Sequence, residues 1–96
     1  MAEVFSIAVF EPLEGKEEEA LETLRGLIRL LAEKNYSRDV VYRDRTSRRY
    51  LDLRYWTSEK ARQEAHEDPQ VHNYWARLGH LVSIEQVFET FDPVQL

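Results

Sequence analysis

Cysteine is absent from the 96-residue sequence, and glycine and proline occur only three times each. A chain without cysteine has no disulfide, no cysteine zinc ligand and no thiol nucleophile. This composition is typical of reducing compartments, and we expect a cytoplasmic protein. A chain of this length has room for one hydrophobic core, so residues 1–96 are predicted to form a single domain.

Long hydrophobic runs and a surplus of positive charge are also lacking. The apolar stretch near the N-terminus, MAEVFSIAVFEP, stops at Glu11 and has no lysine or arginine before it. It is too short for the core of a signal peptide or for a membrane span. The net charge of −5 disfavours nucleic acids, whose phosphates bind basic surfaces. We therefore expect neither a membrane nor a nucleic acid as partner.

The segment from Arg38 to Arg54 is an exception to this negative charge, because it holds six arginines against three aspartates. One interpretation is a solvated turn between two strands, since exposed charges usually only solvate a surface. The other interpretation is a local attractor for an anionic ligand. The sequence leaves both open.

Hydrophobic periodicity and turn residues predict seven elements along the chain. Their order is strand, long helix, two strands joined by a polar turn, two shorter helices and a final strand. Ser58 is a predicted N-cap, Pro69 suits the first position of the next helix, and Pro93 is expected to end the last strand. The expected elements span residues 3–11, 16–35, 39–45, 50–57, 58–68, 69–82 and 83–91.

Apolar stripes at helical spacing predict which helix faces are buried. In the long helix, Leu30 falls outside the stripe and is expected to be exposed or at an interface. The two predicted stripes are Ala20, Leu21, Leu24, Leu27, Ile28, Leu31 and Ala32 in the long helix, and Val71, Tyr74, Trp75, Leu78, Leu81 and Val82 in the last one.

The order of elements predicts an α+β fold of the ferredoxin-like, split βαβ type, with a four-stranded antiparallel sheet and its helices on one face. The first strand, however, is apolar on both of its alternating faces. One face can pack against the protein's own helices, and the other needs a cover from elsewhere. A second copy of the chain in a twofold dimer is the simplest cover, so we expect a homodimer.

Two stretches, EPLEGKEEEALETL and WTSEKARQEAHEDPQVHNYWARL, resemble the antibiotic biosynthesis monooxygenase (ABM-type) family of the dimeric α+β-barrel superfamily. The features in common are a glycine turn before an acidic helix, Trp56 closing the third strand, Ser58 capping a short helix, His66 ten residues after the tryptophan, and Pro69. The resemblance covers nearly the whole chain. It implies a dimeric α+β barrel and the cofactor-independent oxidation of polycyclic phenols or anthrones to quinones that some members perform.

The heme-degrading branch of the superfamily resembles the chain at the same tryptophan and histidine. In that branch the histidine ligates iron and the tryptophan supports a distorted heme, which implies His66 as an axial ligand. Those enzymes also use an asparagine on the first strand, where VFSIAVF offers only Ser6 as a polar side chain. A heme-binding or heme-degrading protein, with the arginine-rich segment near the propionates, is therefore the alternative to a site without a cofactor.

Trp56 and His66 are the candidate catalytic residues. Trp56 would stack on a flat aromatic substrate, although most tryptophans are core residues. His66 lies beside the small residues Ala61 and Ala65, which leave space next to a neutral imidazole that could abstract a phenolic or α-carbonyl proton. The attraction of a helix C-terminus for histidine explains its position equally well. Candidates for substrate binding are Arg54, which could stabilise an anion if it points inward, and His72, Tyr74 and Trp75.

The three histidines at 66, 72 and 80 do not have the spacing of a helical chelating pair, so no metal site is expected. The sequence predicts a cofactor-independent monooxygenase that acts on an aromatic or quinone-like small molecule in a cavity between sheet and helices. A non-catalytic dimer that binds a small molecule would have the same sequence features and remains open, because a fold does not fix a function.

Overall fold

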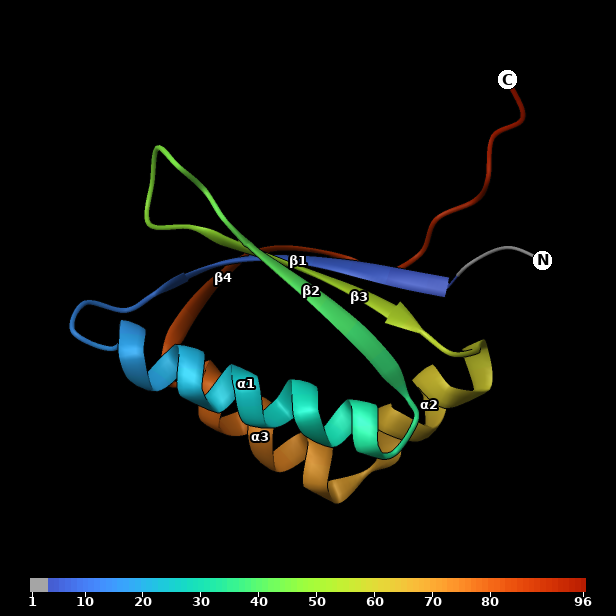
Figure 1. Ribbon diagram of the computed structural model, residues 1–96, viewed down its shortest axis with the longest axis horizontal. Coiled ribbons are helices and arrows are strands. Elements are labelled where there is room, and N and C mark those ends of the chain that lie inside the picture. The colour runs from blue at the N-terminus through green and yellow to red at the C-terminus, as the bar shows by residue number, and fades with distance from the viewer. Residues whose placement is uncertain (1–3) are drawn as a thin grey trace.

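The computed structural model describes residues 4–96, which form four strands and three helices. The strands make one antiparallel sheet in the order β2-β3-β1-β4, and the helices lie together on one face of it (Figure 1). This arrangement confirms the predicted α+β, ferredoxin-like class. The elements are β1 (Val4–Pro12), α1 (Glu17–Glu33), β2 (Ser37–Arg43), β3 (Tyr50–Trp56), α2 (Glu59–Glu67), α3 (Pro69–Gly79) and β4 (Val82–Phe88).

Helix α1 begins after Gly15, whose φ of 76° lies in the left-handed region that favours glycine. Glutamates occupy its first turn, where they complement the helix dipole. The centre of the predicted stripe is buried, but its edges differ from the prediction: Leu30 packs against the core, and Ala32 is exposed. The reason is that α1 contacts both α3 and β2, which shifts its buried face toward Leu30.

The corner between α2 and α3 is fixed by side-chain caps. Ser58 Oγ accepts a hydrogen bond from the Ala61 amide at 3.0 Å, and Asp68 Oδ1 accepts one from the Gln70 amide at 2.9 Å. The N-cap role of Ser58 and the position of Pro69 at the start of α3 are therefore confirmed. Asp68 Oδ2 also accepts a hydrogen bond from Lys34 at 2.6 Å, which ties this corner to the end of α1 and lowers the pKa of Asp68 to about 2.

Strand ends differ from the sequence-based boundaries by a few residues. β2 begins at Ser37 rather than 39, because its pairing with β3 extends to Trp56. β4 ends at Phe88 rather than 91, because the last pair with β1 is Ile7 with Phe88, so Pro93 does not end it. Glu3, which the sequence placed in the first strand, lies outside the described residues. Among those residues, no helix has the length and hydropathy needed to span a bilayer.

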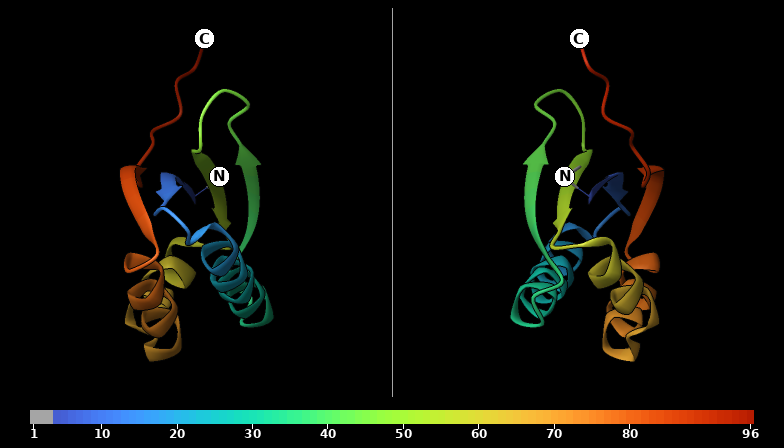
Figure 2. Two further views of the ribbon diagram at one scale, coloured as in Figure 1. Left: turned by 90° about the vertical axis from the view of Figure 1, so that its left-hand side faces the viewer. Right: turned by 90° about the vertical axis from the view of Figure 1, so that its right-hand side faces the viewer.

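The sheet face opposite the helices is apolar and carries no helix of the described part of the chain (Figure 2). Neighbouring strands place apolar side chains side by side on it, as in the pairs Ile7 with Leu53 and Val9 with Leu51. At one edge, Phe91 stacks on Phe5 with ring centroids 4.5 Å apart. Phe88 is 39% exposed and Tyr42 55% exposed. We call this surface the open sheet face.

Close packing of α1 on α3 generates a first prediction. A methyl group at Gly26 would come within 2.8 Å of Tyr74 Cε1, so the tyrosine ring would have to move. In a helix interior, alanine normally stabilises by about 1 kcal/mol relative to glycine. We expect Gly26→Ala to lower the free energy of unfolding in the wild type and to raise it in a Tyr74→Ala background. Urea denaturation of the four proteins measures both effects, and an equal effect in both backgrounds would contradict the contact.

Candidate functional site

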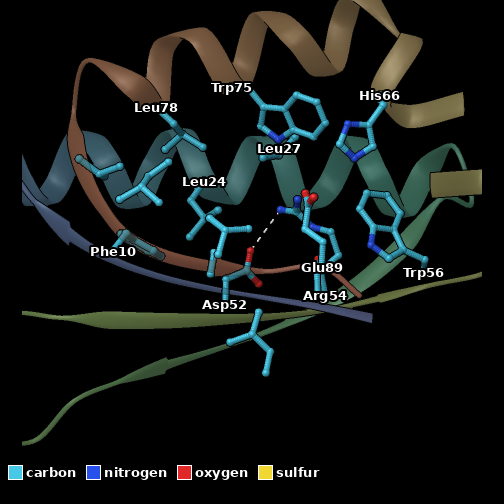
Figure 3. A pocket seen from close by; sticks show the side chains of 16 residues that line it. Phe10, Leu24, Leu27, Asp52, Arg54, Trp56, His66, Trp75, Leu78 and Glu89 are labelled. Carbon is cyan, nitrogen blue, oxygen red and sulfur yellow. Dashed lines mark hydrogen bonds and ion pairs between the residues drawn. The ribbon is translucent and has the colours of Figure 1, made fainter. Parts of the chain in front are cut away.

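A cavity of about 390 Å³ lies between the sheet and the helices. Strands β1 and β3 form its floor, α1 and α3 its roof, and β4 one edge, while His66 of α2 closes one end (Figure 3). Most of the wall is apolar, as is usual for sites that bind small organic molecules. The lining residues are Ser6, Ile7, Ala8, Phe10, Leu24, Leu27, Asp52, Arg54, Trp56, His66, Trp75, Leu78, Val82, Ile84, Val87 and Glu89.

Trp56 is the last residue of β3 and forms part of the cavity wall. Its side chain belongs to the hydrophobic core, and the residue is 7% exposed. Trp56 is therefore both a core residue and part of the cavity wall. The indole Nε1 is buried without a hydrogen-bond partner. A buried N–H group normally has a partner, so this unpaired donor is an exception within the core.

His66 lies in the last turn of α2 with its ring between two tryptophans. The ring centroids are 6.2 Å from Trp56 and 5.0 Å from Trp75, both in tilted arrangements. Ala61 and Ala65, the small residues expected on the inner face of α2, are both buried. The imidazole therefore reaches the cavity from a helix end, beside two indole rings, while the residue itself is exposed to solvent.

Arg54 points toward the helices and is held by two carboxylates. Its Nε donates to Asp39 Oδ2 at 2.9 Å, and its Nη2 donates to Asp52 Oδ2 at 3.1 Å. The side chains of Arg54, Asp39 and Asp52 are only 12%, 0% and 6% exposed. Arg54 is thus inside the cavity wall, but two of its nitrogens already donate hydrogen bonds to neighbouring acids. The rest of the arginine-rich segment does not join it, since Arg43 and Arg49 line a separate hollow beside Tyr50.

Asp52 has an unusual environment for a carboxyl group. Burial, together with the negative charge and hydrogen bonding of Asp39, raises its pKa to about 8, and the positive charge of Arg54 only partly opposes this. Its Oδ1 is buried without a hydrogen-bond partner. Sequence reasoning missed this residue, although a signal was available: position 52 shares a strand face with Arg54 and Trp56.

The cavity brings together four of the six predicted site residues, namely Trp56, His66, Arg54 and Trp75. The other two lie elsewhere. Tyr74 packs against α1 at Gly26, and His72 is exposed, with its Nε2 bonded to the main-chain oxygen of His66. Neither residue lines the cavity, although both belong to α3, which forms part of the cavity roof. Glu89, which follows β4, is a further lining residue that the sequence did not single out.

The lining does not suit a heme. Its arginine is already paired with Asp39 and Asp52, and Glu89 would face propionates of the same charge. The other arginines of the segment do not reach the cavity, so the arrangement expected for heme propionates is not present among the described residues. Nor do three or more His, Asp or Glu side chains gather within residues 4–96 as a metal site requires.

Comparison with solved structures places the fold among known proteins. The chain is similar to SnoaB, a cofactor-independent oxygenase from Streptomyces nogalater, with a TM-score of 0.80, 20% identity and 98% of both chains covered. It is also similar to candidate antibiotic biosynthesis monooxygenases from Chloroflexus aurantiacus (TM-score 0.77, 14% identity, 99% of this chain and 97% of that chain covered) and Deinococcus radiodurans (TM-score 0.75, 15% identity, 97% of both chains covered).

No family model matches the sequence, and no curated protein matches it. At this level of identity the structural similarities establish the fold. The resemblance to ABM-type proteins, made from the residues around Trp56 and His66, is confirmed as a likeness of fold over nearly the whole chain.

The raised pKa of Asp52 generates a second prediction. The folded protein keeps a proton on this carboxyl that the unfolded chain releases near pH 4, so this stabilising contribution is full below about pH 4 and is lost as the pH rises toward about 8. We expect the free energy of unfolding to fall more steeply between about pH 5 and pH 8 in the wild type than in Asp52→Asn. Urea denaturation across this range measures the difference.

A matched control is Asp44→Asn, since the hydrogen bonds of Asp44 in its exposed turn lower its pKa instead of raising it. This variant should keep the wild-type slope over the same range. Parallel profiles for the wild type and Asp52→Asn would mean that Asp52 is ionised in the folded protein at neutral pH.

Proposed function

We propose that this chain is an ABM-type, cofactor-independent monooxygenase that acts on an aromatic or quinone-like small molecule. The observation that carries the proposal is the apolar cavity, in which His66 lies between Trp56 and Trp75. An oxygenase of this kind requires little from the protein: a site that excludes water, a base, and polar groups that hold an anion. The shared fold with SnoaB, itself a cofactor-independent oxygenase, supports it.

The chemistry can be followed on an anthrone, which has a CH₂ group opposite its carbonyl. The neutral imidazole of His66 takes one proton from this carbon, and the resulting anion is stabilised by delocalisation onto the carbonyl oxygen. The anion reduces oxygen, forming a carbon–oxygen bond and a peroxide that recovers a proton from the imidazolium. Loss of water from the hydroperoxide then leaves a carbonyl. In sum, the anthrone and O₂ give the quinone and H₂O, with no electrons drawn from a cofactor.

A homodimer is the second part of the proposal. The open sheet face presents apolar side chains from all four strands, including Ile7, Val40, Leu53 and Phe88. Exposed apolar surfaces of this extent mark interaction sites in proteins. A twofold axis would place the open sheet faces of two copies against each other, which buries the same residues on both sides. We infer the cytoplasm as the location, since the cysteine-free sequence fits it.

Activity measurements on the two ring residues supply a third prediction. With an anthrone or dihydroquinone as substrate and no added flavin, nicotinamide or heme, His66→Ala should lower kcat by about 10²-fold or more, because it removes the base. Trp56→Ala should mainly raise KM, because stacking stabilises the ground and transition states alike. Oxygen uptake and product absorbance follow the reaction.

His80→Ala is the matched control, since His80 is exposed at the end of α3, away from the cavity lining. It should retain the wild-type rate. Melting temperatures of all three variants separate chemistry from stability. If His66→Ala lowers only the melting temperature and leaves oxygen uptake unchanged, the imidazole is a helix-end residue, and a non-catalytic binding dimer becomes the better description.

The dimer has a test of its own, which forms a fourth prediction. Sedimentation at micromolar concentration should show a dimer, as expected for an interface above about 1,000 Å². Phe88→Asp should dissociate it, because an unpaired charge buried in an apolar interface costs several kcal/mol. Leu13→Asp serves as the control, as Leu13 is 43% exposed in the loop before α1. A compact wild-type monomer would contradict the proposed assembly.

A further inference from the structure

The cavity wall carries few charged side chains, and their charges do not balance. Of its 16 lining residues, four can bear a full charge: Asp52, Arg54, His66 and Glu89. Strand β1 and the helices α1 and α3 contribute only uncharged side chains to the lining. Any preference of the cavity for the charge of a ligand therefore depends on these four groups and on their immediate partners.

Arg54 does not leave the cavity with a positive charge. Its Nε donates a hydrogen bond at 2.9 Å to Asp39, whose side chain is fully buried on β2. Asp52, bonded to Nη2 at 3.1 Å, adds nothing to the charge when it is protonated and a second negative charge when it is ionised. Its pKa, raised to about 8 by burial, favours the protonated form at neutral pH. In either form, no positive charge of this cluster remains for a ligand.

Glu89 follows the last residue of β4 and lies at the mouth of the cavity. The cavity opens to solvent along this edge, where Ile84 and Val87 are 58% and 49% exposed. Figure 3 shows the Glu89 carboxylate directed from the sheet toward the helices. The residue is exposed, and within residues 4–96 its carboxylate forms no ion pair. A molecule that enters the cavity therefore passes a negative charge.

Arg62 of α2 is a base that lies within the field of Glu89 but is engaged elsewhere. Its Nη2 donates a hydrogen bond at 2.7 Å to Glu59, and this bond is the main cause of the raised pKa of Arg62. The negative charge of Glu89 contributes least to that shift. Arg62 is thus balanced by a neighbour on its own helix, and the charge of Glu89 stays uncompensated.

We propose that the cavity selects its substrate by charge: it binds neutral and cationic ring molecules and disfavours those that carry a carboxylate or a sulfonate, with Glu89 as the specificity-determining residue at its mouth. This inference rests on the proposed function and narrows its substrate class. An anion would give up its hydration without finding a positive partner, which is an effective way to reject a ligand. A cation would meet Glu89 and the ring of Trp75, whose face attracts positive charge.

A negative cavity is compatible with the proposed chemistry, because proton transfer to His66 creates two opposite charges at once. The imidazolium and the substrate anion form together, so the net charge inside the cavity does not change in this step. Glu89 acts instead on the charge that a molecule brings with it from solution. The selection is therefore made on binding and not in the chemical step.

Three naphthalene derivatives of similar size test the proposal. At about pH 7, 2-naphthamide is neutral, 2-naphthoate is an anion and 2-naphthylmethylammonium is a cation. Titration calorimetry at an ionic strength of about 0.02 M, where charges are little screened, gives the dissociation constants. For the wild type we expect naphthoate to bind roughly 3- to 10-fold more weakly than naphthamide, and the cation at least as tightly as naphthamide. At about 0.5 M salt these differences should shrink, since ions screen an exposed charge.

Variants assign the effect to one residue. Glu89→Gln keeps the shape of the side chain and removes its charge, so naphthoate should bind nearly as well as naphthamide, whose own affinity should not change. Glu89→Lys should make naphthoate bind more tightly than naphthamide. Glu33→Gln is the matched control, because Glu33 is exposed at the end of α1 and does not line the cavity. It removes the same charge from the chain and should keep the wild-type order. Melting temperatures confirm that each variant is folded.

Two outcomes would overturn this inference and leave the proposed function standing. Equal binding of naphthoate and naphthamide to the wild type at low salt would mean that the cavity does not select by charge. Weak binding of naphthoate that Glu89→Gln leaves unchanged would mean that dehydration of the anion rejects it and that Glu89 has no part in it. If none of the three probes binds to the wild type, the cavity is not a ligand site, and the proposed function fails together with the inference.

Discussion

A single guanidinium buried beneath the cavity organises the centre of this protein. Arg54 lies in the middle of β3, where solvent cannot stabilise its charge, and Asp39 and Asp52 contact it from two adjacent strands. Burying a charge is costly unless it is paired and hydrogen-bonded, and removing one partner of such a pair typically destabilises a protein by 3–5 kcal/mol. The pairing of β2 with β3 and the polar floor of the cavity both depend on this arrangement. Asp52 is buried and shares one positive charge with Asp39, so its pKa is raised to about 8.

The order of elements could be predicted because local signals agree along the chain. The Ser58 cap, the proline at the start of α3 and the apolar stripe of α1 each point to the observed structure, and the ferredoxin-like topology follows from their sequence. The buried face of a helix is harder to predict where tertiary contacts decide it. Leu30 is covered because α1 has neighbours on two sides, which no helical periodicity can reveal.

The candidate site could be predicted in part, through residues whose type is itself informative. Trp56 and His66 stand out in the sequence, and the structure places both in the cavity wall. Asp52 does not stand out, because its properties arise from a partner on another strand: Asp39 pairs with Arg54 in the sheet register, fifteen positions away. Nor could the arrangement of β4 be inferred from alternation. A bulge opposite Val9 and Phe10 puts Ile84 and Val87, three residues apart, on the same cavity edge.

This cavity edge has a consequence for how such a protein can diverge. Ile84 and Val87 are 58% and 49% exposed, so the fold gains little from their burial. Surface positions of this kind tolerate exchange at small cost in stability, unlike the fully buried Leu27 across the cavity. Mutation can therefore reshape the mouth of the cavity while the buried acid–base floor and the histidine end stay intact. The architecture thus separates an exposed cavity edge, whose shape can vary without loss of the fold, from a buried floor around Arg54 that cannot.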